Sequence, residues 1–317
     1  MNPHEITAII NPVSANGKTR IIAGTVIESL RRHFGSSLTV RMTSRRNEAA
    51  DIAREAASNG NEAVIAVGGD GTINEIVNGL LSSGNDGNSA CALGIISSGT
   101  GRGLAQSLGL PPTIEEQARV ILSGNTGVIE VGKIRWTENG GSQRLRYFVN
   151  ECQAGIGGHV VRSIEDSGKK RNGFMGFGLT TLKLALTLKN FDIRVSIDGD
   201  GMYEMPMFGV VVANGTHTGG GMNLTPNAKF DDGKLDVLMI CTKSVISRLA
   251  NLPKIYSANH LKSSRFIYVK ARSVRIDSSE PVLLEADGEL LGTLPAEISV
   301  VPNALRVYIP TNGGRHE

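Results

Sequence analysis

The sequence predicts a fold in two parts: an N-terminal doubly wound α/β domain of three layers, and then a β-rich domain that resembles a sandwich. Three observations predict it. Short apolar runs alternate with segments of helical spacing over the first 125 residues. These runs are almost continuously apolar, as are the strands of a parallel sheet that helices cover on both faces. Near residue 128 the pattern changes to many short strands separated by turn signals.

The first part alternates strand and helix. Ile22, Val26 and Leu30 recur at helical spacing, and the run at residues 63–67 is apolar throughout before it meets a glycine pair. We expect strands at residues 6–10, 37–42, 63–67 and 92–96, and helices at 18–33, 47–57, 72–81 and 114–122.

The second part shows strands joined by turns such as Asn139-Gly140-Gly141 and Asp198-Gly199. We expect strands at residues 128–136, 145–150, 192–197, 207–213 and 235–241, several more between 265 and 309, and helices at about 175–188 and 245–256. The expected domains are residues 1–127 and 128–302. Because no Pro- or Ser-rich linker joins them, we expect the domains to pack closely around a cleft, a common place for a ligand.

Composition limits the function classes. Glycine accounts for 39 of the 317 residues, about one in eight against a usual one in about fourteen, and it clusters in short loops beside apolar runs. A net charge of +3 is too weak to argue for nucleic acid. Cys91, Cys152 and Cys241 are widely spaced and suit a reducing compartment. Since there is no signal-peptide pattern and no apolar run of ~20 residues, we expect a cytoplasmic protein, with peripheral contact to the inner face of the membrane left open.

The strongest local signal is the loop Gly68-Gly69-Asp70-Gly71-Thr72, between an expected strand and an expected helix. Consecutive glycines leave backbone N–H groups bare, and the positive end of the following helix favours a phosphate. Thr72 is expected to cap that helix. A plain β-to-α turn would give the same pattern, but a second loop of this kind, residues 97–103, also follows an expected strand.

The loop after the first expected strand ends in Gly17-Lys18-Thr19, like a Walker A loop. Pro12 stands where that motif needs its first glycine, so we reject a P-loop NTPase. Neither Gly99-Thr100-Gly101 nor Gly155-Ile156-Gly157-Gly158 completes a GxGxxG fingerprint, which argues against a dinucleotide redox fold. Three Gly/Ser/Thr loops at the carboxyl ends of neighbouring parallel strands predict a ligand site there.

Six motifs follow one another along the chain: Asn11-Pro12 with Gly17-Lys18, residues 68–72 followed by Asn74-Glu75, Gly99-Thr100, Asn214 with Gly219-Gly220-Gly221, Pro226-x-Ala228-x-x-x-Asp232-Gly233-x-Leu235-Asp236, and Asp287-Gly288-Glu289. Taken in order, they resemble those of the diacylglycerol kinase catalytic family, which includes bacterial lipid kinases and sphingosine kinases. The sequence departs from the bacterial pattern at Arg102-Gly103, where many members have Asn-Asp, and at Ala15, where Gly is common. The first departure is closer to the Gly-x-Gly-Asn-x-Leu-Ala pattern of sphingosine kinases.

The resemblance implies an ATP-dependent lipid kinase that uses Mg²⁺ and phosphorylates a hydroxyl of diacylglycerol or a related lipid at a membrane surface. It implies no nucleic-acid partner, leaves a homodimer open, and returns residues 303–317 to the first domain. Asp70 would lie near the phosphates and their Mg²⁺, and Asp287 or Glu289 would be the general base. Asp232 and the backbone carbonyls of Lys229 and Lys234 would hold a structural Mg²⁺. The residues implied to contact ATP are Asn11, Pro12, Val13, Ser14, Ala15, Thr43, Gly68, Gly69, Asp70, Gly71, Thr72, Ile73, Asn74, Glu75, Gly99 and Thr100.

Other interpretations stay open. Asp287-Gly288 is also a strong hairpin signal, and Glu285, Asp287 and Glu289 alternate as on a solvated strand face. NAD kinases share the GGDGT motif and a later Asn-Glu, here Asn150-Glu151. A non-catalytic nucleotide- or lipid-binding protein that keeps the fold is a third candidate.

One further motif concerns membranes. The basic run Lys169-Lys170-Arg171 precedes an apolar segment with helical character. It is either a membrane-contact element or the solvated start of a packed helix.

Overall fold

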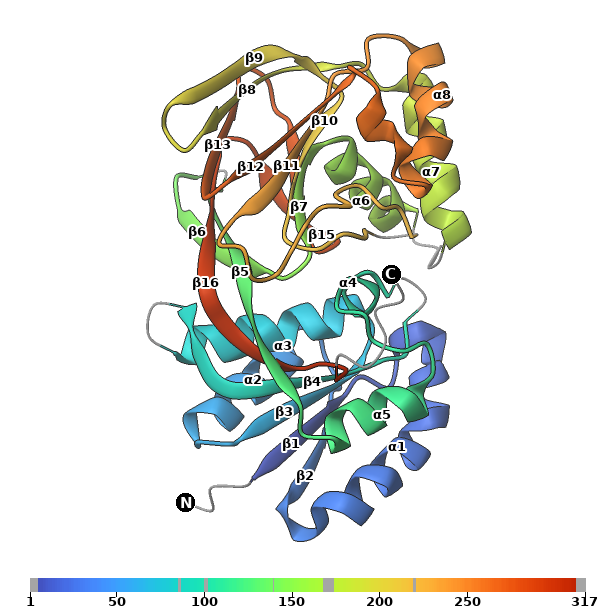
Figure 1. Cartoon of the computed structure of the whole chain (residues 1–317), viewed down its shortest axis with the longest axis vertical. Helices are drawn as coiled ribbons and strands as arrows, with labels where there is room; N and C mark the ends of the chain where they lie inside the picture. Colours follow the sequence, from blue (N-terminus) through green and yellow to red (C-terminus); the bar gives the residue numbers. More distant parts are fainter. Residues whose placement is uncertain are drawn as a thin grey trace. The chain divides into compact units, whose positions relative to one another are not determined.

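The computed structural model describes residues 5–84, 87–99, 102–138, 140–167, 174–218 and 221–311, without the side chains of Phe174, Met175 and Phe177. The chain divides into two compact units (Figure 1). The first unit comprises Met1–Glu130 with Pro302–Glu317, and the second comprises Val131–Val301.

A parallel sheet forms the middle of the first unit. Its strands are β1 (Ile6–Ile10), β2 (Leu38–Met42), β3 (Ala63–Gly68), β4 (Ser89–Ser97) and the end of β16 (Ala296–Tyr308). They run in the order β2-β1-β3-β4-β16, and every pair is parallel. All five residues of β1 are buried, which explains why this run carries no polar alternation in the sequence.

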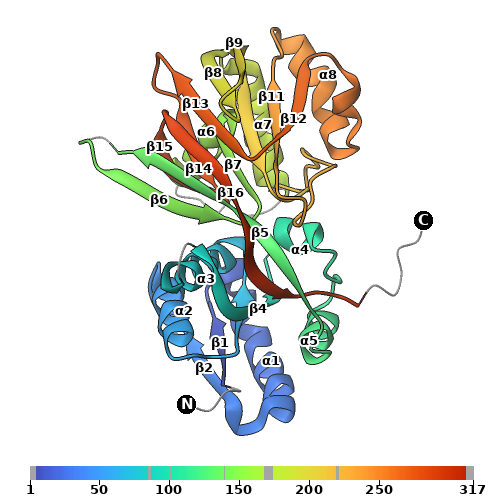
Figure 2. The ribbon, with the colours of Figure 1, turned by 60° about the vertical axis from the view of Figure 1, so that its left-hand side comes forward.

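Helices cover both faces of this sheet. In Figures 1 and 2, α1 (Lys18–Phe34) and α5 (Ile114–Leu122) lie on one face, and α2 (Glu48–Ser58) and α3 (Asp70–Ser83) lie on the other. Val26 and Leu30 of α1 pack with Ile121 of α5 in one apolar core with the strands. The predicted doubly wound, three-layer domain is therefore confirmed. Three short elements complete the unit: η1 (Ser14–Gly17), η2 (Gly35–Ser37) and α4 (Gly103–Ser107).

Antiparallel strands make up most of the second unit. One sheet has the order β12-β11-β10-β7-β14-β15, and further antiparallel pairs join β9 to β8, β8 to β13, β13 to β16 and β5 to β6. Side chains of both groups share one core, such as Ile193 and Val274 with Val212 and Leu284, as in a sandwich. The bounds are β5 (Thr126–Thr137), β6 (Gln143–Phe148), β7 (Glu151–Gly155), β8 (Phe191–Ile197), β9 (Gly201–Met207), β10 (Gly209–Ala213), β11 (Leu235–Ile240), β12 (Phe266–Ala271), β13 (Ser273–Ser278), β14 (Leu283–Ala286) and β15 (Glu289–Thr293).

Helices pack on the outer face of the six-stranded sheet. They are α6 (Ile156–Asp166), α7 (Phe174–Thr187) and α8 (Val245–Tyr256), with η4 (Asn259–Lys262) after α8. Val160 of α6 and Ile255 of α8 share a core with Val211 and Leu238 of the sheet. The predicted β-sandwich-like second domain is confirmed.

Several elements differ from expectation. Strand β7 was not expected, and β9 overlaps the expected strands only at Met207. The strand expected over residues 207–213 is interrupted at Phe208, because β9 pairs with β8 while β10 pairs with β7 and β11. Helix α6 was not expected, because it begins in the glycine-rich run that follows β7. Among the described residues, no helix is long and apolar enough to cross a membrane.

Candidate active site

In the first unit, the loops that follow β1, β3 and β4 are held together by hydrogen bonds. Asn11 Nδ2 donates to Thr72 Oγ1 at 2.9 Å, which joins the first loop to the start of α3. The Thr19 hydroxyl lies 2.5 Å from Ser14 Oγ and 2.6 Å from Ser98 Oγ, which joins the first loop to the third. The sequence-predicted convergence of three polar loops is thus present in this unit.

The loops that follow β3 and β4 approach each other closely at two glycines, Gly69 and Gly99. A Cβ placed on Gly99 would lie 3.0 Å from the Cα of Gly69, and a Cβ on Gly68 would lie 2.8 Å from the Cβ of Thr72. A side chain on Gly99 would therefore push the two loops apart, and one on Gly68 would clash with Thr72 within its own loop. The close approach leaves backbone amides as the surface that these glycines present, which fits a phosphate-bearing ligand such as ATP.

Helix α3 begins directly after this contact. Its N-cap is Gly69, without a side-chain cap, so the expectation that Thr72 caps the helix is wrong. Thr72 lies in the first turn and its hydroxyl accepts the hydrogen bond of Asn11 instead. Asp70 is the first helical residue, and its Oδ2 accepts a 3.4 Å hydrogen bond from the backbone N–H of Gly103. A carboxylate at a helix N-terminus is favoured by the helix dipole.

The departure at Arg102 has a structural explanation. Arg102 adopts φ +48°, and its guanidinium donates to the carbonyls of Pro111 and Pro112 at 2.6 and 3.0 Å. The side chain ties α4 to the segment before α5, a role that sequence reasoning missed because it depends on contacts nine and ten residues away. Ala15, the other departure, has φ +52°, a region in which glycine is easier to place.

The other predicted ATP contacts are distributed as follows. Thr43 follows β2 and its N–H donates to the carbonyl of Ile10, beside the first loop. The side chains of Thr72, Ile73 and Asn74 are buried, and the N–H of Ile73 donates to the backbone carbonyl of Gly69. Thr100 lies outside the described residues. The remaining positions, Pro12, Val13, Gly71 and Glu75, lie in the first loop and the first turns of α3.

In the second unit, Asp287 and Gly288 form the tight turn between β14 and β15. Both have positive φ, +46° and +82°, so the hairpin interpretation is correct for the backbone. The Asp287 carboxylate accepts N–H bonds from Val149, Asn150 and Glu151 at 2.8, 3.0 and 2.9 Å. These three bonds fix the carboxylate in one orientation at the loop between β6 and β7.

The neighbouring carboxylates differ from each other. Glu289 forms an ion pair of 2.8 Å with Arg146, whose side chain is 20% exposed. Glu285 is 2% exposed, so the interpretation of Glu285, Asp287 and Glu289 as a solvated face is wrong for Glu285. Burial raises the pKa of Glu285 to about 8. A hydrogen bond from the N–H of Gly288 lowers this pKa, but its effect is smaller than that of burial. The hairpin thus places one proton-holding carboxyl group beside Asp287.

The implied structural Mg²⁺ site does not fit the described arrangement. Asp232 Oδ1 accepts the N–H of Lys234, and Asp232 Oδ2 lies 2.7 Å from the ammonium of Lys270. The one carboxylate that the resemblance assigns to the metal is therefore already paired with a cation of the protein itself.

Two family models match the chain. Residues 5–134 match the diacylglycerol kinase catalytic domain, and residues 150–309 match the YegS C-terminal NAD kinase beta sandwich-like domain. A YegS-like lipid kinase of Chromohalobacter salexigens is 31% identical over 287 residues, which are 88% of this chain and 86% of that protein. The chain belongs to the diacylglycerol kinase family. The resemblance inferred from its motifs is confirmed.

Other members of the diacylglycerol kinase family align over almost the whole chain. The diacylglycerol kinase of Bacillus subtilis is 27% identical over 304 residues, 95% of each protein. A solved structure from Bacillus anthracis, described as a diacylglycerol kinase, has a TM-score of 0.79 at 26% identity and covers 97% of this chain and 95% of its own. Yeast NADH kinase complexed with NADH has a TM-score of 0.57 at 14% identity, covers 99% of this chain and 85% of its own, and shares the fold alone.

Proposed function

We propose that this protein is an ATP-dependent lipid kinase that transfers the γ-phosphoryl group, with Mg²⁺, to a hydroxyl of diacylglycerol or a related lipid. The observation that supports it most is the contact of Gly69 with Gly99, where a Cβ would meet backbone at 3.0 Å. Phosphoryl transfer depends mainly on positioning and charge neutralisation. Backbone N–H groups at the start of α3 can position the phosphates of a nucleoside triphosphate and help to neutralise their charge.

The nucleotide side of the reaction belongs to the first unit. The loop amides and the first turn of α3 would hold the phosphates, and Asn11 and Thr72 would keep two loops in register through their 2.9 Å hydrogen bond. Asp70 would face the Mg²⁺ that accompanies ATP and that neutralises phosphate charge when bound.

The acceptor side belongs to the second unit. We assign Asp287 as the group that orients the lipid hydroxyl and takes its proton late in the transfer, because three backbone N–H bonds hold its carboxylate in place. Glu289, paired with Arg146, is assigned a positioning role. An alcohol has a high pKa, so a carboxylate assists only as the O–P bond forms.

The test is transfer of labelled γ-phosphate from ATP and Mg²⁺ to mixed micelles of diacylglycerol, monoacylglycerol, sphingosine or phosphatidylglycerol, with NAD as a parallel acceptor. We expect a labelled lipid that disappears in Asp287→Ala. Labelled NADP would support the NAD kinase alternative instead. Measurable ATP binding without transfer to any acceptor would support the non-catalytic alternative.

We also propose that the second unit meets its substrate at an anionic membrane surface. On α7, Leu179, Leu182 and Leu186 are 59%, 39% and 51% exposed, and on α8 Ile246 is 80% exposed. Residues 174–190 and 241–265 contain no Asp or Glu, but they contain several lysines. Apolar side chains bordered by basic ones are typical of surfaces that lie on anionic lipid. Residues 169–171, the basic run noted in the sequence, lie outside the described residues.

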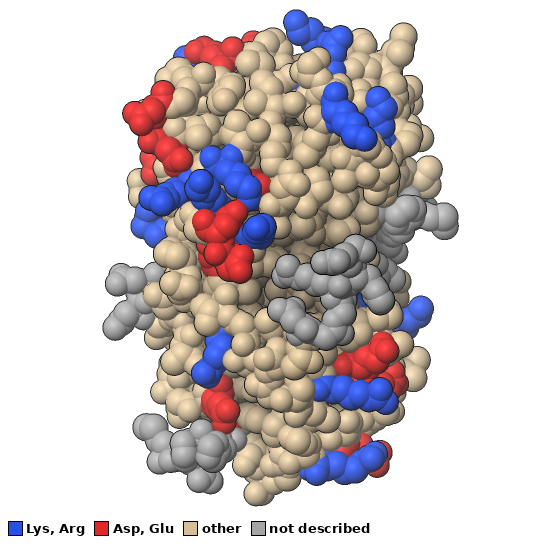
Figure 3. Space-filling model, in the orientation of Figure 1, with Lys and Arg blue, Asp and Glu red and all other residues tan. Residues whose placement is uncertain are grey.

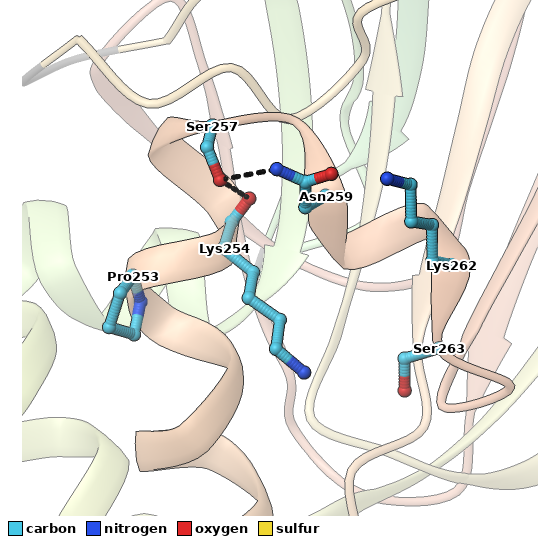
Figure 4. A pocket seen from close by; sticks show the side chains of 6 residues that line it. All are labelled: Pro253, Lys254, Ser257, Asn259, Lys262 and Ser263. Carbon is cyan, nitrogen blue, oxygen red and sulfur yellow. Dashed lines mark hydrogen bonds between the residues drawn. The ribbon is translucent and has the colours of Figure 1, made fainter.

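The end of this helical face is hollowed. A pocket of about 400 Å³ is lined by Pro253, Lys254, Ser257, Asn259, Lys262 and Ser263 (Figure 4). Lys254 and Lys262 lie on opposite sides of this pocket (Figure 4). In Figure 3, the upper right, where α7 and α8 lie, shows Lys and Arg side chains in blue but no Asp or Glu side chains in red. The pocket contains none of the sequence-predicted site residues, and its charge suits the same anionic surface.

Replacing one exposed side chain tests this surface. We expect Ile246→Ser to weaken binding to vesicles of phosphatidylglycerol and phosphatidylcholine by about fivefold, because about 1 kcal/mol of apolar burial in lipid is lost. Cosedimentation measures the effect. The matched control is Ile21→Ser, since Ile21 on α1 is also 80% exposed. Equal binding of Ile246→Ser and Ile21→Ser would contradict the proposed surface.

A further inference from the structure

Strand β12 places a lysine against an acidic loop in the second unit. Lys270 lies directly opposite Asp236 in the antiparallel pair of β12 and β11. Its ammonium is 2.7 Å from Asp232 Oδ2, 3.1 Å from Asp236 Oδ2 and 3.2 Å from the backbone carbonyl oxygen of Asn227. All three oxygens belong to one stretch of chain, residues 227–236, which leads into β11.

This arrangement has the features of a cation site. Two carboxylates and a carbonyl are the hard oxygen donors that Mg²⁺ and Ca²⁺ use in proteins. An ammonium has three N–H donors, and each of the three oxygens here lies within hydrogen-bond distance of the nitrogen. The charge at the centre of the group is supplied by the protein itself.

The buried carboxylate explains why a cation is needed. The side chain of Asp236 is fully buried, and its second oxygen accepts the hydroxyl of Tyr268 at 2.5 Å. An ionised carboxylate in that position is costly unless an opposite charge accompanies it. The Lys270 side chain, 29% exposed, reaches in from the neighbouring strand to provide that charge.

We propose that the Lys270 ammonium is the resident cation of residues 227–236 and that it replaces the structural Mg²⁺ that the sequence resemblance assigns to Asp232. A divalent ion on Asp232 would have to share its carboxylate with a positive charge already 2.7 Å away, and the two cations would repel each other. The folded second unit therefore holds this loop without a bound metal. The assignment does not depend on which acceptor the kinase uses.

Thermal unfolding of the whole protein without nucleotide tests the assignment. We expect the wild-type Tm in EDTA and in 10 mM MgCl₂ to agree within about 1 °C, since a metal that does not bind the native state cannot stabilise it. We expect Lys270→Met, which keeps the length of the side chain, to lose about 5 °C or more in EDTA because two carboxylates lose their partner. Mg²⁺ or Ca²⁺ should then restore most of that loss by taking the vacated position.

Matched variants make the result specific. Lys262→Met removes an exposed lysine of η4, and its Tm should stay near that of the wild type with and without Mg²⁺. A wild-type Tm that rises with Mg²⁺, with the rise abolished in Asp232→Asn, would overturn the assignment, because the metal would then be the natural occupant. A Lys270→Met protein that loses stability and gains nothing from either ion would overturn the view of this loop as a cation site. If Lys270→Met does not fold, the comparison of wild type with Asp232→Asn still decides.

Discussion

We expect Asp287→Asn to lower kcat/KM for lipid phosphorylation by about 10³-fold, because in the proposed reaction the variant cannot accept the proton of the acceptor hydroxyl. The amide oxygen can still accept from the N–H groups of Asn150 and Glu151, so the turn should still form. The N–H of Val149 loses its acceptor, Asp287 Oδ2, and the lost charge and hydrogen bond together should cost about 2 kcal/mol of stability. Initial rates on lipid micelles, with the folded fraction determined by thermal unfolding, measure the two effects separately.

The second unit contains a matched control for this variant. Asp198-Gly199 is also a tight Asp-Gly turn with positive φ, +50° and +84°, and it lies between β8 and β9. The Asp198 carboxylate likewise accepts backbone N–H bonds, from Arg272 at 2.9 Å and from Ser273 at 2.8 Å. Because both of these bonds end on Asp198 Oδ1, which an amide oxygen can replace, we expect Asp198→Asn to lose less stability than Asp287→Asn and to keep its activity. Equal losses of activity in the two variants would show that Asp287 acts only as a turn residue.

The comparison of these two turns shows what the sequence can predict. An Asp-Gly pair between apolar runs predicts a hairpin at both positions, and both hairpins are present. The partners of each carboxylate are not local, since Val149 lies 138 residues before Asp287. The role proposed for the turn at Asp287 therefore rests on the ordered family motifs and not on the local pattern.

Helices, too, could be predicted where their signals are local and were missed where they depend on distant residues. Helix α8 has the expected bounds, because its capping Ser244 and its apolar spacing are local signals. Helix α6 was missed because its glycines look like a loop. These glycines are needed because of a contact with a residue far away in the sequence: a Cβ on Gly158 would lie 2.7 Å from Leu283. In the same way, no local pattern could pair Lys270 with Asp232, which lies 38 residues earlier on another segment.

Glu285 gives a prediction about pH and stability. Burial raises its pKa from the ordinary 4.5 to about 8 in the folded protein. Between these two pH values the unfolded chain has released the proton of Glu285 while the folded protein still holds it. The free energy of unfolding should therefore be highest, with respect to this group, below pH 4.5 and should fall as the pH rises to about 8.

Glu285→Gln removes this dependence. The amide oxygen can still accept the N–H of Gly288, which lies 2.9 Å from Glu285 Oε2, and no charge has to be buried at alkaline pH. We expect the variant to be more stable than the wild type at pH 9 by about 5 kcal/mol, and to match it near pH 4.5. Urea unfolding across this pH range measures the difference, with Glu280→Gln as the control for an exposed glutamate of the loop before β14.

The same variant separates the roles of the neighbouring carboxyl groups. Because burial raises the pKa of Glu285 to about 8, most folded molecules hold this proton at pH 7, and the proposed base is Asp287. Glu285→Gln should therefore keep most of the lipid kinase activity at pH 7. Parallel pH curves of unfolding for the wild type and for Glu285→Gln would contradict the buried proton. A loss of activity as large as that of Asp287→Asn would instead move the proton-accepting role from Asp287 to Glu285.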